Sequence, residues 1–289
     1  MIQSCQSMTR LASMVLLVIL TSACGGVIRK VQNGLAEQLT QSALNHDDPE
    51  TVGAALPAYL LLLDASADGP DADGASLCSA AKLYGTYAGA FVSDGPRQQR
   101  LSARALRYGV RGACALEKPL CAANMRNFED LESVVDKLGG DELAALACLG
   151  AAWASDVQAR ADQPDAQADA PKVRVIYERI AALNPTYGNG EAQMVLGVMN
   201  SLLPPALGGK PEIGAAHFKK AIEISNAKNL MAKVLYAQFY ARLIFDQALH
   251  DKLLNDVLTA PLEAKDLTLS NQIAKTRALA LLESGKDYF

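Results

Sequence analysis

The sequence predicts an all-α protein made of helical hairpins. Aromatic residues account for 6% of the chain and runs of Val, Ile and Thr are scarce, which favours helix over sheet. Amphipathic segments of helical length follow one another, separated by turns rich in Gly, Pro, Asn and Asp. Because helix, turn and helix in succession are typical of repeat proteins, we expect cryptic tetratricopeptide-like hairpins stacked as a solenoid or a ring-like bundle.

The first 23 residues predict a lipoprotein signal peptide. Arg10 is the only charged residue in this segment, and residues 11–20 are almost wholly apolar. An apolar stretch of that length suits a signal peptide and is too short to span a membrane. The following Leu20-Thr21-Ser22-Ala23-Cys24 resembles a bacterial lipobox, although Thr21 stands where Leu is preferred. We therefore expect cleavage before Cys24 and attachment of fatty acids such as palmitate to it; the alternative is ordinary secretion with cleavage near Ala23.

A lipidated Cys24 would anchor the protein to a membrane through two or more acyl chains. Gly25 follows it, where an aspartate often directs retention at the inner membrane. We therefore expect the periplasmic side, with the outer membrane favoured over the inner membrane.

The remainder reads as a tether and N-terminal segment over 24–46 and one helical domain over 47–289. Pro49 and Glu50 predict a helix start, because Pro suits the first turn and Glu the positive end of a helix. That helix is expected to end near Ala65, in a loop over 64–74 that is rich in Asp, Gly and Pro; a second, polar loop is expected over 161–171. The other expected helices cover 75–92, 97–115, 127–137, 141–160, 172–183, 191–203, 211–225, 230–245, 247–258 and 269–284.

Two segments carry the spacing of a tetratricopeptide repeat. Leu149-Gly150 is followed by Tyr177 and by Pro185 eight residues after it, and Leu196-Gly197 is followed by Phe218. In such repeats the glycine lets two helices approach and the aromatic ring fills the space between them. In both segments the link between the two helices is longer than the repeat usually has.

Four cysteines besides Cys24 lie beyond the signal segment, an even number that allows disulfides in an oxidising compartment. Cys114 and Cys121 bracket Pro119, which favours a local bridge between them. Cys78 and Cys148 lie in apolar helical stretches and read as small core residues. Their spacings match no zinc site.

Five segments resemble a known family more specifically than the repeat spacing does. They are Tyr84–Phe91, Asn184–Gly190, Leu196–Lys210, Asn229–Arg242 and Asp287–Phe289. Together they strongly resemble, in order, the T component of tripartite ATP-independent periplasmic (TRAP) transporters, the TatT kind. The resemblance implies a periplasmic lipoprotein of cryptic tetratricopeptide helices that associates with a solute-binding protein and has an accessory, ligand-handling role. It also implies a homo-oligomer, a trimer in some members.

The sequence shows no catalytic or nucleic-acid-binding pattern. A net charge of -4 gives no general attraction for nucleic acid. Gly208-Gly209-Lys210 lacks the first glycine and the hydroxyl residue of a phosphate loop. The three histidines are isolated, and no nucleophile, base and acid are grouped. We therefore expect no enzyme activity, no cofactor and no metal site.

Five arginines predict one stripe on the helix over 97–115. They are Arg97, Arg100, Arg104, Arg107 and Arg111, spaced alternately three and four residues apart. The stripe reads either as a solvated face or as a contact for an acidic partner. The loop containing Pro204, Pro205, Gly208 and Gly209 is a second candidate contact, because it is rigid and apolar; otherwise it only caps its own hairpin.

Two aromatic helix faces are candidates for lining a pocket or pore, although such residues usually form core. They comprise Tyr84, Tyr87 and Phe91, and Tyr236, Phe239 and Tyr240, to which Asn189 is added from the quoted segments. Two functions follow from these features. The first is an accessory protein of a TRAP system that docks a solute-binding protein and binds or channels a small hydrophobic ligand. The alternative is an outer-membrane scaffold lipoprotein for envelope assembly.

Overall fold

The computed structural model describes residues 38–69, 72–121 and 127–289, and within these ranges every regular element is helical. The predicted all-α class is confirmed. The expected signal peptide and Cys24 lie outside the described residues. After a short helical segment at 38–44, the α-helices are α2 (Pro49–Ala67), α3 (Gly74–Phe91), α4 (Gly95–Leu116), α5 (Phe128–Val135), α6 (Leu143–Ala159), α7 (Pro164–Leu183), α8 (Glu191–Ser201), α9 (Pro211–Ile224), α10 (Leu230–Leu235), α11 (Gln247–Thr259) and α12 (Thr268–Tyr288).

Aspartates fix the starts of the first three of these helices. Asp48, Asp73 and Asp94 each accept a hydrogen bond from a backbone N–H in the first turn, at 2.9, 2.7 and 2.8 Å. A side-chain acceptor there satisfies one of the N–H groups that the helix cannot pair internally. Local chemistry therefore sets where α2, α3 and α4 begin.

The polar loop expected over 161–171 is wrong for most of its length, because α7 already begins at Pro164 and contains Pro171 in its interior. Tertiary contacts explain the longer helix. Ala166 is fully buried, and Asp169 lies 3.4 Å from the indole nitrogen of the buried Trp153. Lys172 completes the contact, since its ammonium lies over the Trp153 ring. Packing here outweighs the polar composition that predicted a loop.

The single helix expected over 230–245 is also wrong. α10 ends at Leu235 and the chain continues as a π-helical segment, η5 (Tyr236–Ala241). The extra residue in this turn places Tyr236 and Tyr240 in the core while Phe239 stays half-buried on another side. After η5 a turn follows to Phe245, whose φ of 56° is left-handed.

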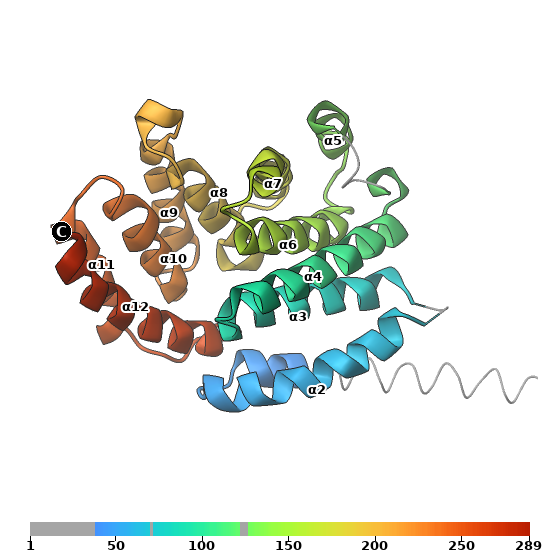
Figure 1. Ribbon diagram of the computed structural model, residues 1–289, viewed down its shortest axis with the longest axis horizontal. Coiled ribbons are helices and arrows are strands. Elements are labelled where there is room, and N and C mark those ends of the chain that lie inside the picture. Colours follow the sequence, from blue (N-terminus) through green and yellow to red (C-terminus); the bar gives the residue numbers. More distant parts are fainter. Residues whose placement is uncertain (1–37, 70–71, 122–126) are drawn as a thin grey trace, which may run out of the picture.

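The helices pack mainly against helices close to them in the chain, with α3 against α4, α8 against α9, and α4 against α6 across the short α5 (Figure 1). The last helix departs from this rule because α12 contacts α2 (Figure 1). Leu269 of α12 belongs to the apolar cluster of α2, α3 and α4. The Asn45 side chain accepts a hydrogen bond from the Asp266 backbone N–H at 2.8 Å and donates one to its carboxylate at 3.3 Å. The first and last helices are thus joined.

The two glycines singled out by repeat spacing lie at close helix contacts. A Cβ added to Gly150 would come within 2.9 Å of Ile176 and 3.3 Å of Tyr177. A Cβ added to Gly197 would come within 2.7 Å of the Phe218 ring. The absence of a side chain therefore permits α6 to approach α7 and α8 to approach α9.

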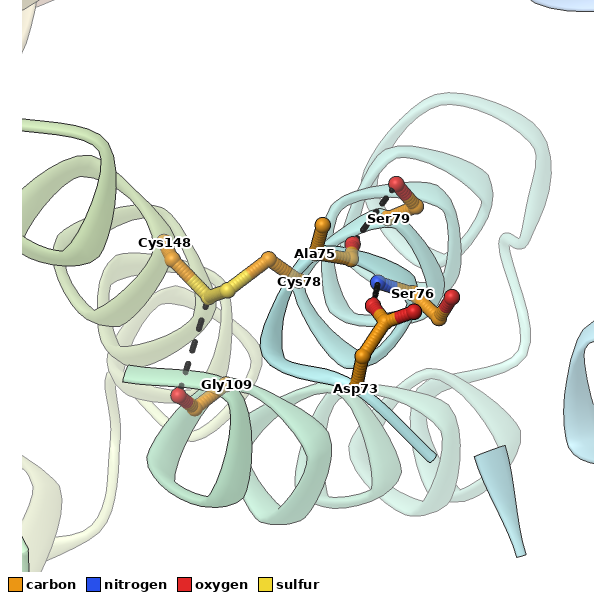
Figure 2. The surroundings of a disulfide bond; sticks show 7 residues. All are labelled: Asp73, Ala75, Ser76, Cys78, Ser79, Gly109 and Cys148. Carbon is orange, nitrogen blue, oxygen red and sulfur yellow. Dashed lines mark hydrogen bonds between the residues drawn. A yellow bond between two sulfur atoms is a disulfide. The ribbon is translucent and has the colours of Figure 1, made fainter. Parts of the chain in front are cut away.

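Two disulfides link helices near the N-terminal half of the domain. Cys114 is bonded to Cys121, across the short segment that ends α4. Cys78 of α3 is bonded to Cys148 of α6, so the expectation that these two are only small core residues is wrong (Figure 2). The missing side chain of Gly112 on α4 makes room, since a Cβ there would lie 2.7 Å from the Cys78 sulfur. A bridge between residues 70 apart stabilises the fold by about 4 kcal/mol in the chain-entropy model.

Replacing Gly197 with Leu is expected to destabilise the protein by about 1–3 kcal/mol, because the new side chain overlaps Phe218. Gly89→Leu is the matched control, since a Cβ at this helical glycine meets nothing within 4 Å. Urea unfolding followed by circular dichroism measures both. Equal free energies of unfolding for the two variants would contradict the close contact of α8 and α9.

Candidate ligand-binding cavity

A cavity of about 970 Å³ lies where the N-terminal helices meet the C-terminal helices. We call it the central cavity. Its N-terminal side is lined by Leu44, by Pro49, Glu50 and Gly53 of α2, and by Gly85, Thr86, Tyr87, Gly89, Ala90 and Phe91 of α3. The α6–α7 region contributes Ala154, Val157, Gln158, Ala161 and Val173, and the α8 region contributes Glu191, Met194, Val195, Val198, Met199 and Leu202. Its C-terminal side is lined by Met231, Leu235 and Phe239 of α10 and η5, and by Leu269, Ser270, Ile273, Thr276 and Arg277 of α12. Its size is at the upper end of pockets that hold small molecules.

The walls of the central cavity are predominantly apolar. On α8 the side chains of Met194, Val195 and Val198 line the cavity and are half-buried, while Leu196 is buried on another side of the helix. An apolar side chain that faces a cavity rather than another side chain forgoes packing contacts, which an apolar ligand would restore. Methionine adapts to ligands of different shape because its side chain is unbranched and flexible.

The α3 wall has space in place of side chains. Gly85 and Gly89 lie one turn apart on the cavity face, and a Cβ at Gly89 would meet nothing within 4 Å. Beside them Tyr87 and Phe91 stack with ring centroids 6.0 Å apart. An aromatic pair next to open glycine surface forms a flat apolar platform.

Few charged side chains reach this cavity. Glu191 accepts a hydrogen bond from the Tyr177 hydroxyl at 3.2 Å, and burial raises the pKa of that hydroxyl well above its usual value. Glu50 lies in the first turn of α2, where the positive end of the helix favours it. Arg277 of α12 donates to the Gln238 side chain at 3.2 Å, and burial lowers the pKa of its guanidinium. Arg277 is the cation in this lining.

The structure brings together three of the seven residues offered for pocket or pore lining, namely Tyr87, Phe91 and Phe239. Tyr84, Tyr236 and Tyr240 are core residues outside the lining, which corrects their assignment. The Tyr84 hydroxyl donates to Asp64 at 2.7 Å. Tyr236 stacks between Phe218 and Tyr240, and the Tyr240 hydroxyl donates to Glu212 at 3.0 Å. Asn189 is exposed, away from the cavity, with a left-handed φ of 54°.

The arginine stripe on α4 divides into two sets. One set lies over tyrosine rings: Arg97 over Tyr87, Arg104 over Tyr84 and Arg111 over Tyr108. Arg104 also forms an ion pair with Asp64 at 2.6 Å. Arg111 also donates to the Ala67 carbonyl of α2 at 2.9 Å, so Arg97, Arg104 and Arg111 hold α4 against α2 and α3.

The second set of the stripe consists of Arg100 and Arg107, which are exposed. Neither forms an ion pair with the part of the chain that the structure describes. Unlike the other three arginines of the stripe, these two side chains make no ring or ion-pair contact within the described residues, so they are available for contact with a partner.

The loop after α8 is tightly folded. A Cβ at Gly209 would overlap the Leu203 carbonyl, and Gly208 has a φ of 85°, so both positions require glycine. Pro205 and Gly208 are exposed, while Pro204 and Gly209 are half-buried. Leu202, at the root of the loop, lines the cavity and is 48% exposed. The loop therefore connects directly to the edge of the cavity.

Sequence reasoning missed the α8 and α12 walls. The available signal was a second apolar face on α8, beyond the one that packs in the core. On α12, Leu269, Ile273 and Arg277 repeat every four residues, so the arginine continues an apolar stripe. A charged residue in line with an apolar face is the pattern that identifies Arg277.

Within the described residues, no group of acidic, His or Cys side chains could hold a metal ion. No described helix combines the length and apolar character needed to cross a bilayer. The cavity walls thus offer shape, apolar surface and one guanidinium to a ligand.

The family model described as TRAP transporter T-component matches residues 45–289. The chain belongs to this family. The matched region includes every residue that lines the central cavity except Leu44. Membership gives the protein an accessory role in TRAP transport. No curated protein matches the chain.

Proposed function

We propose that this TRAP transporter T-component binds a small hydrophobic ligand in its central cavity while docked to the solute-binding protein of its transport system. The observation that carries the proposal is the apolar lining around about 970 Å³ in a family with a role in transport. The ligand would pass between the two proteins at the edge formed by Leu202 and the Pro204–Gly209 loop, which is the second proposed contact. In this function the protein binds and positions, without catalysis.

Docking would use the exposed arginines of α4. Arg100 and Arg107 share a face of the helix, and exposed arginines suit ion pairs with an acidic partner. The lipidated Cys24 would hold the protein at the periplasmic face of the membrane, with the outer membrane favoured. A trimer, as the family resemblance implies, would place several cavities side by side.

The helices would act as a stacked series of tetratricopeptide-like hairpins that supports the cavity. The support for this is the pairing of Gly150 with Tyr177 and of Gly197 with Phe218, each at a close contact between consecutive helices. Each hairpin alone leaves an apolar face exposed, so it gains stability from its neighbours.

Filling the central cavity should abolish ligand binding. Gly89→Phe places a ring in the open space of the α3 wall, and it also removes a helical glycine, so stability should not fall. We expect radiolabelled dodecanol, a neutral apolar ligand, to bind the wild-type full chain in lipid nanodiscs above the level of empty nanodiscs. The variant should lose that excess.

Gly140→Phe is the matched control, because a Cβ there also meets nothing within 4 Å but the residue lies outside the cavity. It should bind like the wild type. No excess binding to the wild type, combined with no binding of the solute-binding protein, would contradict the transport role and favour the scaffold function.

Charge reversal at Arg100 and Arg107 together should weaken binding of the solute-binding protein by roughly tenfold at low salt, mainly through slower association. Folding should be unaffected, since both residues are exposed. Surface plasmon resonance at low and high salt measures the effect. Affinities that are equal for wild type and variant at both salts would show that these arginines are only a solvated face.

Arg104→Glu, in contrast to that variant, should affect the stability of the fold. It sets a new carboxylate against Asp64, whose side chain is 16% exposed, and should destabilise the fold by about 1–3 kcal/mol. Partner binding should then fall only in step with the folded fraction.

Cys24→Ser should prevent acylation and leave the signal segment uncleaved, because the thiol is the proposed site of lipid attachment. Metabolic labelling with palmitate should mark the wild-type protein and leave the variant unlabelled. An unlabelled wild-type protein released into the periplasm would contradict lipid anchoring.

A further inference from the structure

Arg277 differs from the other half-buried arginines in what surrounds it. Arg104 and Arg160 each pair with a carboxylate, at 2.6 Å for Arg104, while Arg174, Arg179 and Arg242 each donate to a backbone carbonyl. In the described part of the chain, Arg277 has no carboxylate within ion-pair distance. Its neighbours are the Gln238 amide oxygen and, at 3.9 Å, the sulfur of Met231.

Such a guanidinium is costly in an apolar wall. A charge that is partly removed from water needs compensation from an opposite charge or from strong hydrogen bonds. A neutral amide and a thioether compensate little, and burial accordingly lowers the pKa of Arg277. Because a guanidinium presents parallel N–H groups in one plane, its best complement is a carboxylate, which accepts two hydrogen bonds at once.

The rest of the lining limits the ligand to one such charge. Glu50 of α2 and Glu191 of α8 belong to the same lining, and each would repel a second anionic group that approached it. Most of the remaining surface is apolar, from Met194 and Val198 on α8 to Ile273 on α12. The lining therefore suits an apolar body with one negative head.

We propose that the ligand of the central cavity is an amphiphile with a single carboxylate head, and that Arg277 binds this head. The proposal rests on the proposed ligand-binding function and adds the chemical class of the ligand. The apolar chain would lie along α8 and α12, and the carboxylate would complete the hydrogen bonding of the guanidinium.

The test compares three radiolabelled ligands of equal chain length on the full chain in nanodiscs, each corrected for empty nanodiscs and used below its micelle concentration. Dodecanoate carries one carboxylate, dodecanol carries none and dodecanedioate carries two. The wild-type protein should bind dodecanoate at least about tenfold more tightly than either of the others. Equal affinities for dodecanoate and dodecanol would overturn the role of the head group, and tighter binding of dodecanedioate would overturn the single charge.

The variant Arg277→Gln tests whether this residue binds the carboxylate head of the ligand. It should weaken dodecanoate binding by about 10–100-fold and leave dodecanol binding unchanged, since only the charged head loses its partner. Arg277→Lys should restore part of the loss. Lys219→Gln is the control, because it removes one positive charge from an exposed site outside both the cavity and the proposed docking face, and it should bind like the wild type.

The outcomes separate the two proposals. If dodecanol binds and Gly89→Phe blocks it, while Arg277→Gln leaves dodecanoate binding unchanged, the cavity binds ligands but Arg277 does not select them. If neither dodecanol nor dodecanoate binds the wild-type protein, the ligand-binding function fails and the head-group assignment fails with it.

Discussion

The contact between α2 and α12 brings the two ends of the domain together around the central cavity. Leu269 of α12 packs into the apolar cluster of α2, α3 and α4, and Asn45 is hydrogen-bonded to Asp266. Without that contact, α8 and α12 would present their apolar sides to open solvent. With it, the same sides become walls of the central cavity.

The contact of α2 with α12 explains why the cavity combines apolar walls with one unpaired cation. α3 and α12 are far apart in sequence, and each has its own partners, in α4 for α3 and in α11 for α12. Where these surfaces face each other they leave space beside Gly89, at which an added Cβ would meet nothing within 4 Å. Arg277 lines this cavity without a carboxylate of the described chain at ion-pair distance, which is the observation behind the proposal that a ligand supplies one.

The sequence allowed most helices to be predicted, because Pro, Asp and Gly at their ends and the 3.6-residue periodicity are local signals. It failed where contacts distant in sequence decide the outcome. The burial of Trp153 against Asp169 turned an expected polar loop into part of α7. The stripe on α4 looked uniform, yet the ion pair of Arg104 with Asp64 gives that arginine a structural role. The cavity could not be foreseen for the same reason, since its walls are assembled from both ends of the domain.

The central claim is that the cavity closed by α12 is where the ligand lies, and a crystal structure of the full chain grown with dodecanoate tests it most directly. The account predicts continuous electron density for one alkyl chain between α8 and α12, with its carboxylate within hydrogen-bond distance of the Arg277 guanidinium. A cavity that holds only ordered water, with the alkyl chain bound elsewhere or absent, would contradict it.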